Sequence, residues 1–140
     1  GILSESSEEL ITALGSFGIH LGNAFQIIDD NLDYESDSSM IGKEIGDDLS
    51  EGKVTLPMIY ALEQTTGKEN KILTNAITEA DASNIDNIVD ILVNVNAFEF
   101  SRNVAKDESI KALNSLKVIP ESNYRSALKL LCELSLERQS

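Results

Sequence analysis

Residues 25–34 read Phe-Gln-Ile-Ile-Asp-Asp-Asn-Leu-Asp-Tyr, so that three carboxylates follow a long apolar run. A helical rotation of about 100° per residue places one amide and three carboxylates on a single face, at positions Gln26, Asp29, Asp30 and Asp33. Carboxylates on one face repel one another, and each is costly to remove from water. The pattern predicts a helix whose acidic face meets either bulk water or a cation.

The residues that precede this stretch predict a helix over residues 7–34 that is buried nearly all round. Apolar side chains recur there every three or four residues, and Ser6 or Ser7 is suited to cap the first turn. Three glycines extend the acidic face towards the N-terminus, and each costs about 1 kcal/mol relative to alanine. A central helix with carboxylates at its end favours a site for a hard metal ion. A solvated acidic helix end is the alternative.

The rest of the chain predicts more helices, short turns and no strand, within one domain over residues 1–140. A helix begins within residues 54–57, with Thr55 as its expected cap, and ends near Thr66. Further helices are expected over residues 68–80, 84–95, 97–118 and 123–138, the last capped by Ser122.

The longest predicted loop covers residues 35–53 and is rich in glycine, serine and acidic residues. Loops of this length without their own secondary structure are often functional. Lys43 and Lys53 each follow a glycine there. They indicate either a charged surface loop or a clamp that holds a phosphate opposite the acidic face, with a metal ion shared between them.

Composition narrows the class of protein. The net charge of −13 argues against nucleic acid or an anionic membrane as a partner. A single cysteine, Cys132, forms no internal disulfide and is expected in the core, which favours a reducing, cytoplasmic location. No uninterrupted apolar run reaches 18 residues, so no membrane span is expected.

Magnesium fits the acidic face better than other metals do. A calcium loop that began at Asp29 would need glycine at Tyr34 and an acid at Met40. Zinc lacks ligands, since His20 and Cys132 are the only residues of their kinds, and His20 is expected to have a local partner instead. Mg²⁺ typically binds through one or two carboxylates together with substrate phosphates. No nucleotide-binding P-loop motif is present.

The motifs FQIIDDNLDY (residues 25–34) and GKEIGDDLSEGKVTLP (residues 42–57) closely resemble the second aspartate-rich region of the all-trans polyprenyl diphosphate synthases. The segment VIPESNYRSALKLLCELSLER (residues 118–138) is similar to the C-terminal end of the longer-chain bacterial members, with octaprenyl diphosphate synthases as the nearest match. The resemblance covers essentially the whole chain.

The resemblance implies an all-α helical bundle of the isoprenoid synthase type around a deep cavity. It also implies a Mg²⁺-dependent prenyltransferase that elongates an allylic diphosphate with isopentenyl diphosphate to a long all-trans product, an octaprenyl-like precursor of quinone side chains. The matching positions suggest metal ligands (Asp29, Asp30, Asp33), catalytic residues (Asp29, Asp30, Lys43) and substrate-binding residues (Phe25, Gln26, Lys43, Lys53). Asp29 is the residue most expected to contact the metal directly.

The chain also departs from the family pattern. The first aspartate-rich motif and the basic residues for isopentenyl diphosphate are absent, so the resemblance implies a C-terminal part of a homodimeric enzyme that is inactive alone. Asn96 stands where members often have glycine. Two alternatives are a non-catalytic regulatory subunit of a heteromeric prenyl synthase and a helical interaction module with an acidic patch.

Overall fold

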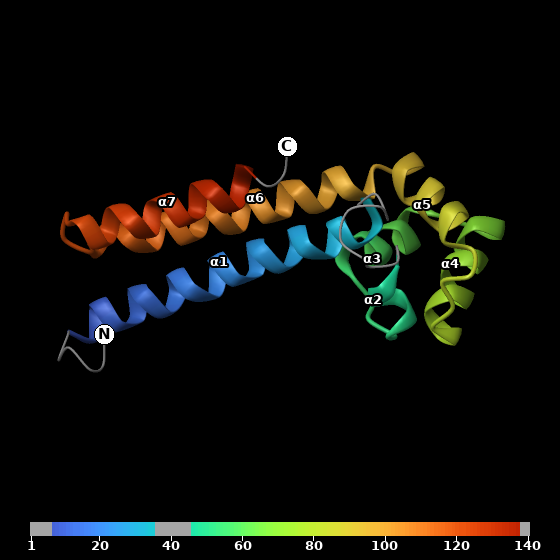
Figure 1. Cartoon of the computed structure of the whole chain (residues 1–140), viewed down its shortest axis with the longest axis horizontal. Helices are drawn as coiled ribbons and strands as arrows, with labels where there is room; N and C mark the ends of the chain where they lie inside the picture. The colour runs from blue at the N-terminus through green and yellow to red at the C-terminus, as the bar shows by residue number, and fades with distance from the viewer. Residues whose placement is uncertain (1–6, 36–45, 138–140) are drawn as a thin grey trace. The chain divides into compact units, whose positions relative to one another are not determined.

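The computed structural model describes residues 7–35 and 46–137, and these contain helices and no strand (Figure 1). The helices are α1 (Glu8–Glu35), α2 (Asp47–Ser50), α3 (Leu56–Gln64), α4 (Gly67–Glu79), α5 (Ile85–Asn94), α6 (Ala97–Ser115) and α7 (Asn123–Glu137). A 3-10 turn, η2 (Leu116–Val118), follows α6. The all-α prediction is confirmed over the described residues. The structure adds α2, which lies inside the segment expected to be a loop.

Two of the three expected helix caps form. The Ser7 hydroxyl accepts the Leu10 N–H at 3.4 Å, and the Ser122 hydroxyl accepts the Arg125 N–H at 3.2 Å. Thr55 occupies the N-cap position of α3, but its side chain makes no capping hydrogen bond. The hydroxyl of Thr55 is used elsewhere, as described below.

Asn96 lies between α5 and α6 with a φ of 57°. This left-handed conformation favours glycine, and asparagine is among the few other residues that adopt it readily. The backbone geometry therefore accommodates asparagine at this position at low cost.

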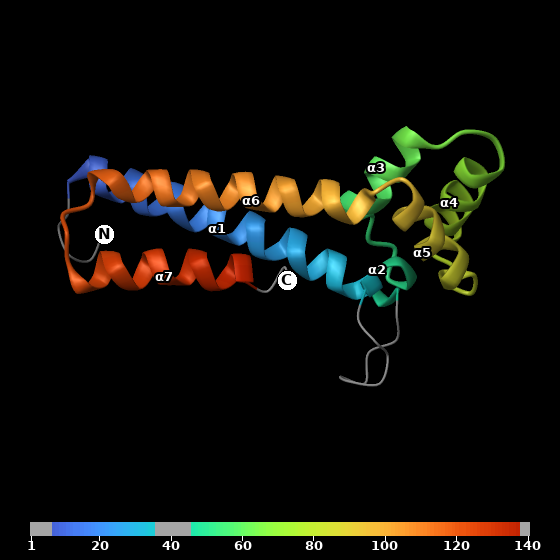
Figure 2. The same cartoon turned by 90° about the horizontal axis from the view of Figure 1, so that it is seen from above.

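The chain divides into two compact units, Gly1–Ile28 with Asn103–Ser140, and Asp29–Arg102. In the first unit, the N-terminal part of α1 lies alongside α6 and α7, as both views show (Figures 1 and 2). Its core consists of two small clusters of buried side chains: Phe17, Ala112, Leu116 and Cys132, and Ala24, Ile28 and Ala105. Cys132 is fully buried, as expected for a core residue.

Helix α1 is buried on one side only in the first unit. Ile19 is 65% exposed and Phe25 is 47% exposed. A Cβ atom added at Gly15, Gly18 or Gly22 would meet no described atom within 4 Å. The prediction of a helix buried nearly all round is therefore wrong for this unit, because two neighbouring helices cover only the side that faces them.

By length and composition, α1 is the one helix within residues 7–35 and 46–137 that is apolar enough to cross a membrane, with a mean hydropathy of 1.2 over 18 residues. Core helices of soluble proteins pass the same test, so this is weak evidence. The expectation of no membrane span stays a prediction.

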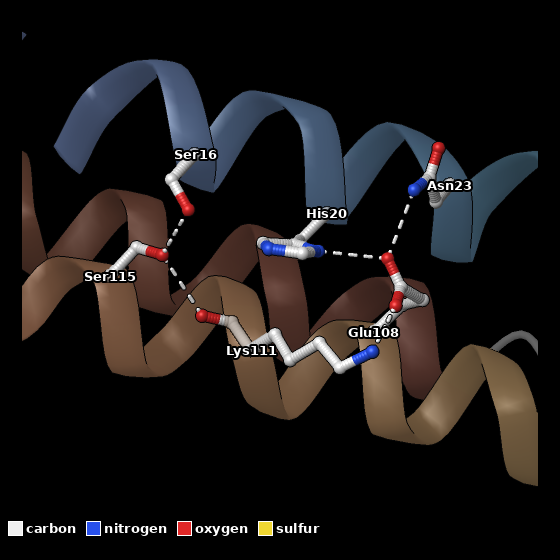
Figure 3. A network of polar contacts seen from close by, with 6 residues as sticks. All are labelled: Ser16, His20, Asn23, Glu108, Lys111 and Ser115. Atoms are coloured by element: carbon white, nitrogen blue, oxygen red, sulfur yellow. Dashed lines mark hydrogen bonds and ion pairs between the residues drawn. The ribbon is translucent and has the colours of Figure 1, made fainter. Parts of the chain in front are cut away.

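A polar network joins α1 to α6 in the first unit (Figure 3). The buried carboxylate of Glu108 accepts from Nδ1–H of His20 at 2.8 Å, from the Asn23 amide at 3.0 Å and from the Lys111 ammonium at 2.6 Å. His20 thus has a partner, as expected, although that partner is distant in sequence. The hydrogen bonds from His20, Lys111 and Asn23 lower the pKa of Glu108 to about 2.

We expect Glu108→Gln to lower the free energy of unfolding by about 1–2 kcal/mol at neutral pH, because hydrogen bonds to a charged acceptor are lost. The folded-state pKa of about 2 lies below the ordinary value of 4.5, so the ionised carboxylate stabilises the fold above pH 4.5. That contribution disappears as the pH falls through about 2. Urea titrations at several pH values should therefore show the two proteins converging in acid, whereas the exposed control Asp107→Asn should stay close to wild type throughout. A pH-independent difference between Glu108→Gln and wild type would contradict this account.

The second unit is held by a single larger core. Side chains from the end of α1, from α2 to α5 and from the start of α6 form it, and its members include Tyr34, Leu49, Met58, Leu73, Ile88, Leu92 and Phe98. Gly46 lies at its edge with a φ of 84°, and its N–H donates to the Asp33 carbonyl at 3.1 Å. A Cβ atom at Gly46 would lie 2.6 Å from Cδ1 of Ile85, so a side chain would both strain the backbone and crowd α5.

We expect Gly46→Ala to destabilise the chain by about 2 kcal/mol, from left-handed strain and from the displaced Ile85 side chain. Gly52 is a matched control, since its φ is 78° but nothing lies within 4 Å of its Cβ position. Gly52→Ala should therefore cost only the strain, about 1 kcal/mol. Thermal and chemical denaturation of the two variants would separate the backbone strain from the crowding of Ile85. An equal loss of unfolding free energy in both variants would contradict the crowding and show that Ile85 moves aside freely.

Candidate functional site

The acidic turn at the end of α1 is divided by the packing of the second unit. Asp30 and Asp33 are buried, at 7% and 6% exposed, whereas Asp29 is exposed. Helical periodicity placed all three on one face. The segment from Gly46 to Thr55 returns against part of that face, so two carboxylates are enclosed and one is left open to solvent.

Lys53 lies between two carboxylates. Its ammonium donates to Oδ1 of Asp30 at 2.7 Å and to Oδ2 of Asp48 at 2.8 Å. Burial alone would lower the pKa of Lys53, but the hydrogen bonds to Asp30 and Asp48 outweigh it and raise the pKa above its ordinary value. Lys53 is therefore a fixed positive charge beside the acidic turn, and its side chain is still 41% exposed.

Asp33 anchors the returning segment to α1. Its Oδ2 accepts the Asp48 N–H at 3.1 Å, and its backbone carbonyl accepts the Gly46 N–H at 3.1 Å. The Lys53 N–H then donates to the Asp48 carbonyl at 2.8 Å, which closes the turn that contains α2. The backbone and carboxylate of Asp33 thus position Asp48, which in turn holds Lys53.

Tyr34 extends the site into the core. Its side chain is 2% exposed, and its ring centroid lies 6.3 Å from that of Phe98. The Thr55 hydroxyl donates to the Tyr34 oxygen at 3.4 Å. Burial raises the pKa of Tyr34 to about 12, the Thr55 hydrogen bond opposes this, and Asp33, Asp48 and Asp30 add to the rise. The phenol therefore stays protonated at neutral pH.

Asn31 fixes the acidic turn to the start of α6. Its side chain is 2% exposed and its amide donates to the Phe98 carbonyl at 3.1 Å. The Asn31 Oδ1 atom is buried and has no hydrogen-bond partner among the described residues. Such a group costs about 1–3 kcal/mol.

The predicted substrate-binding residues Phe25 and Gln26 belong to the first unit, and both are exposed on α1. Phe25 borders an apolar hollow of about 520 Å³ in that unit. The other lining residues are Gly18, Leu21, Gly22, Leu131, Leu134 and Ser135. Lys43 lies outside the described residues.

Within the part of the chain that the structure describes, no three His, Cys, Asp or Glu side chains are grouped so as to hold a metal ion. The metal-binding role of Asp29, Asp30 and Asp33 therefore stays a prediction. Sequence reasoning assigned no role to Asp48. The signal for it was the motif G-x-D followed five residues later by lysine, a spacing that one turn can close.

Comparison with known proteins identifies the family. A family model described as polyprenyl synthetase matches residues 1–94. The chain is 44% identical over 125 residues to the all-trans-nonaprenyl-diphosphate synthase (geranyl-diphosphate specific) of Rhodobacter capsulatus. This match covers 89% of this chain and 38% of that protein. It is 36% identical over 138 residues to the octaprenyl diphosphate synthase of Haemophilus influenzae, covering 98% and 42% of the two chains.

Solved structures agree with this assignment. A decaprenyl diphosphate synthase from Rhodobacter capsulatus matches with a TM-score of 0.89 and 31% identity, over 100% of this chain and 44% of that one. A polyprenyl synthase from Caulobacter crescentus, complexed with calcium and isoprenyl diphosphate, matches with a TM-score of 0.80 and 30% identity, over 92% and 40%. The chain spans about two-fifths of the length of these relatives. It belongs to the polyprenyl synthetase family and has the all-α fold of the isoprenoid synthases.

Proposed function

We propose that this chain supplies the part of a Mg²⁺-dependent all-trans polyprenyl diphosphate synthase that binds the allylic diphosphate. The observation that carries the proposal is Lys53, a cation held between Asp48 and Asp30, the residue that follows the exposed Asp29 in sequence. An ammonium on a flexible stem suits a phosphate oxygen, and its exposed fraction leaves it accessible to one.

The donor set fits magnesium. Asp29 offers exposed carboxylate oxygens. The carboxylate of Asp30 accepts a hydrogen bond from Lys53, and that of Asp33 accepts one from the Asp48 N–H. Mg²⁺ usually takes one or two carboxylates and completes its shell with water and substrate phosphate, so a closed set of three ligands is not required. We therefore assign Asp29 as the direct ligand and Asp30 and Asp33 as residues that act beside it. When bound, Mg²⁺ would add positive charge next to the departing diphosphate.

The residues of this chain would act on the leaving group. When the carbon–oxygen bond of an allylic diphosphate breaks, negative charge grows on the diphosphate oxygens. A fixed ammonium at Lys53 would stabilise that charge without having to reorganise, because Asp30 and Asp48 already orient it. Lys43 is proposed for the same role on the basis of the resemblance alone, and Gln26 and Phe25 are proposed to lie near the prenyl end.

The rest of the proposal concerns the whole enzyme. We propose isopentenyl diphosphate as second substrate, a long octaprenyl-like product, a cytoplasmic location and a homodimeric assembly. The longer-chain assignment is supported by the nonaprenyl and octaprenyl synthases among the relatives.

We expect Asp29→Asn to weaken the binding of inorganic pyrophosphate to the 140-residue chain in the presence of Mg²⁺ by about tenfold or more, since a direct metal ligand is lost. Lys53→Met should weaken it by about tenfold, with or without the metal. Isothermal titration calorimetry would measure both, with Glu9→Gln as a control, because Glu9 is an exposed acid at the other end of α1. Unchanged affinities in the first two variants would remove the proposed function.

We expect the 140-residue chain alone to give no elongation of an allylic diphosphate, because its sequence holds one D-D-x-x-D motif, at residues 29–33. The assay supplies a radiolabelled isopentenyl diphosphate, an allylic diphosphate and Mg²⁺, and it measures the extracted prenyl product. A full-length relative serves as the positive control. Turnover by the chain alone would refute this expectation, and pyrophosphate binding without Mg²⁺ dependence would favour the non-catalytic subunit instead.

A further inference from the structure

We propose that Tyr34 and Thr55 form a second link beside the Asp30–Lys53 ion pair and act as positioning residues for Lys53. The inference rests on the diphosphate-binding function proposed above for Lys53. Neither residue would touch substrate. Both would act by fixing the backbone from which the Lys53 side chain extends.

The spacing of the two links matches on both sides. Asp30 and Tyr34 are four residues apart on α1, so they share a face and lie about 6 Å apart along the helix axis. Lys53 and Thr55 are two residues apart outside any helix, and an extended chain advances about 6–7 Å over two residues. In keeping with these similar spacings, the structure holds both the ion pair at 2.7 Å and the hydroxyl contact at 3.4 Å.

The conformation of residues 53–55 places both partners on one side. Thr55 has φ −92° and ψ 163°, which is extended backbone, and alternate side chains of an extended chain point in opposite directions. Val54, which lies between Lys53 and Thr55 in sequence, is 43% exposed, whereas Thr55 is 2% exposed. The contacts agree with this, since Lys53 and Thr55 both bond residues of α1, whereas Val54 between them is exposed.

Thr55 makes this contact and no local capping bond. It occupies the N-cap of α3, where a threonine hydroxyl ordinarily accepts an N–H from the first turn. Pro57 has no N–H to offer, but Met58 does, and the Thr55 side chain caps neither. The hydroxyl instead donates to Tyr34, which ties the start of α3 to the acidic turn.

This second link matters because a lysine side chain is long and flexible. The ion pair alone holds the ammonium in place at a cost in conformational entropy, because several rotatable bonds of the side chain become fixed. Anchoring Thr55 limits the movement of the backbone two residues before it, so less freedom remains to be lost when Lys53 meets a ligand. Removing either partner should loosen Lys53 even though every atom of the ion pair is still present.

The direct test is the exchange of the Lys53 ammonium protons with water, followed by NMR on the full chain and assigned by the signal that Lys53→Met removes. We expect Tyr34→Phe and Thr55→Val each to speed this exchange by about threefold or more, as local opening becomes easier. Thr55→Ser keeps the hydroxyl and should restore the wild-type rate. Tyr60→Phe and Thr65→Val are matched controls, because Tyr60 stacks on Phe100 and the Thr65 hydroxyl donates to the Ala61 carbonyl of α3, the helix that Thr65 follows.

A double-mutant cycle with inorganic pyrophosphate and Mg²⁺ separates positioning from general stability. Tyr34→Phe should raise the dissociation constant by about three- to tenfold in the wild-type background and leave it unchanged in the Lys53→Met background. Denaturation midpoints measured alongside show whether each variant is folded. A merely structural role would lower stability without this dependence on Lys53.

The outcomes are distinguishable. Wild-type exchange rates in Tyr34→Phe and Thr55→Val would overturn the inference whatever happens to binding. An effect of Lys53→Met on affinity without any effect of Tyr34→Phe would also overturn it and would leave the proposed function standing. Unchanged affinity in Lys53→Met, or no pyrophosphate binding by the wild-type chain, would contradict the proposed function, and faster proton exchange would still support the link itself.

Discussion

The site depends on one ammonium group placed between two carboxylates from different segments. Asp30 belongs to the last turns of α1, and Asp48 belongs to α2. Without a cation between them, the buried carboxylate of Asp30 and the partly buried carboxylate of Asp48 would repel each other, which would push the returning segment away from α1. Lys53 supplies that cation from the end of the same segment, so one side chain both closes the turn and balances its charge.

Backbone contacts make this arrangement specific. Gly46 approaches α1 closely enough to donate to the Asp33 carbonyl, and its left-handed conformation turns the chain into α2. The Asp33 carboxylate then accepts a hydrogen bond from the Asp48 N–H. This bond satisfies a backbone donor in the first turn of α2, where the helix itself offers no acceptor. Gly46 and the Asp33 carboxylate thus determine where the Lys53 side chain lies. The chemistry proposed for the site follows from that position.

Most of the helical architecture could be predicted from the sequence, because helix signals are local. Apolar periodicity, proline at residue 57 and serine caps fixed α1, α3 and α7 to within one or two residues. Helix α2 was missed because its four residues are too few to show periodicity and depend on contacts with Asp33. The burial of α1 was misjudged for a related reason, since the pattern shows which side chains are apolar but not how many neighbours cover them.

The candidate site was predicted in part. The motif identified Asp29, Asp30, Asp33 and Lys53, and the structure brings Asp30 and Lys53 into direct contact. Helical spacing treats the three aspartates alike, so it could not separate the exposed Asp29 from the two enclosed acids. That difference arises from a segment that returns after an intervening stretch of chain, as does the role of Asp48. Long-range contacts of this kind have no periodic signature in the sequence.

The burial of Tyr34 has a consequence for how durable the site is. With a pKa near 12, this phenol keeps its proton in alkali strong enough to ionise half of an ordinary tyrosine population. Its oxygen consequently never adds a fourth negative charge to the neighbouring aspartates under conditions in which proteins normally work. Over that pH range the Tyr34 oxygen stays neutral in its contact with the Thr55 hydroxyl.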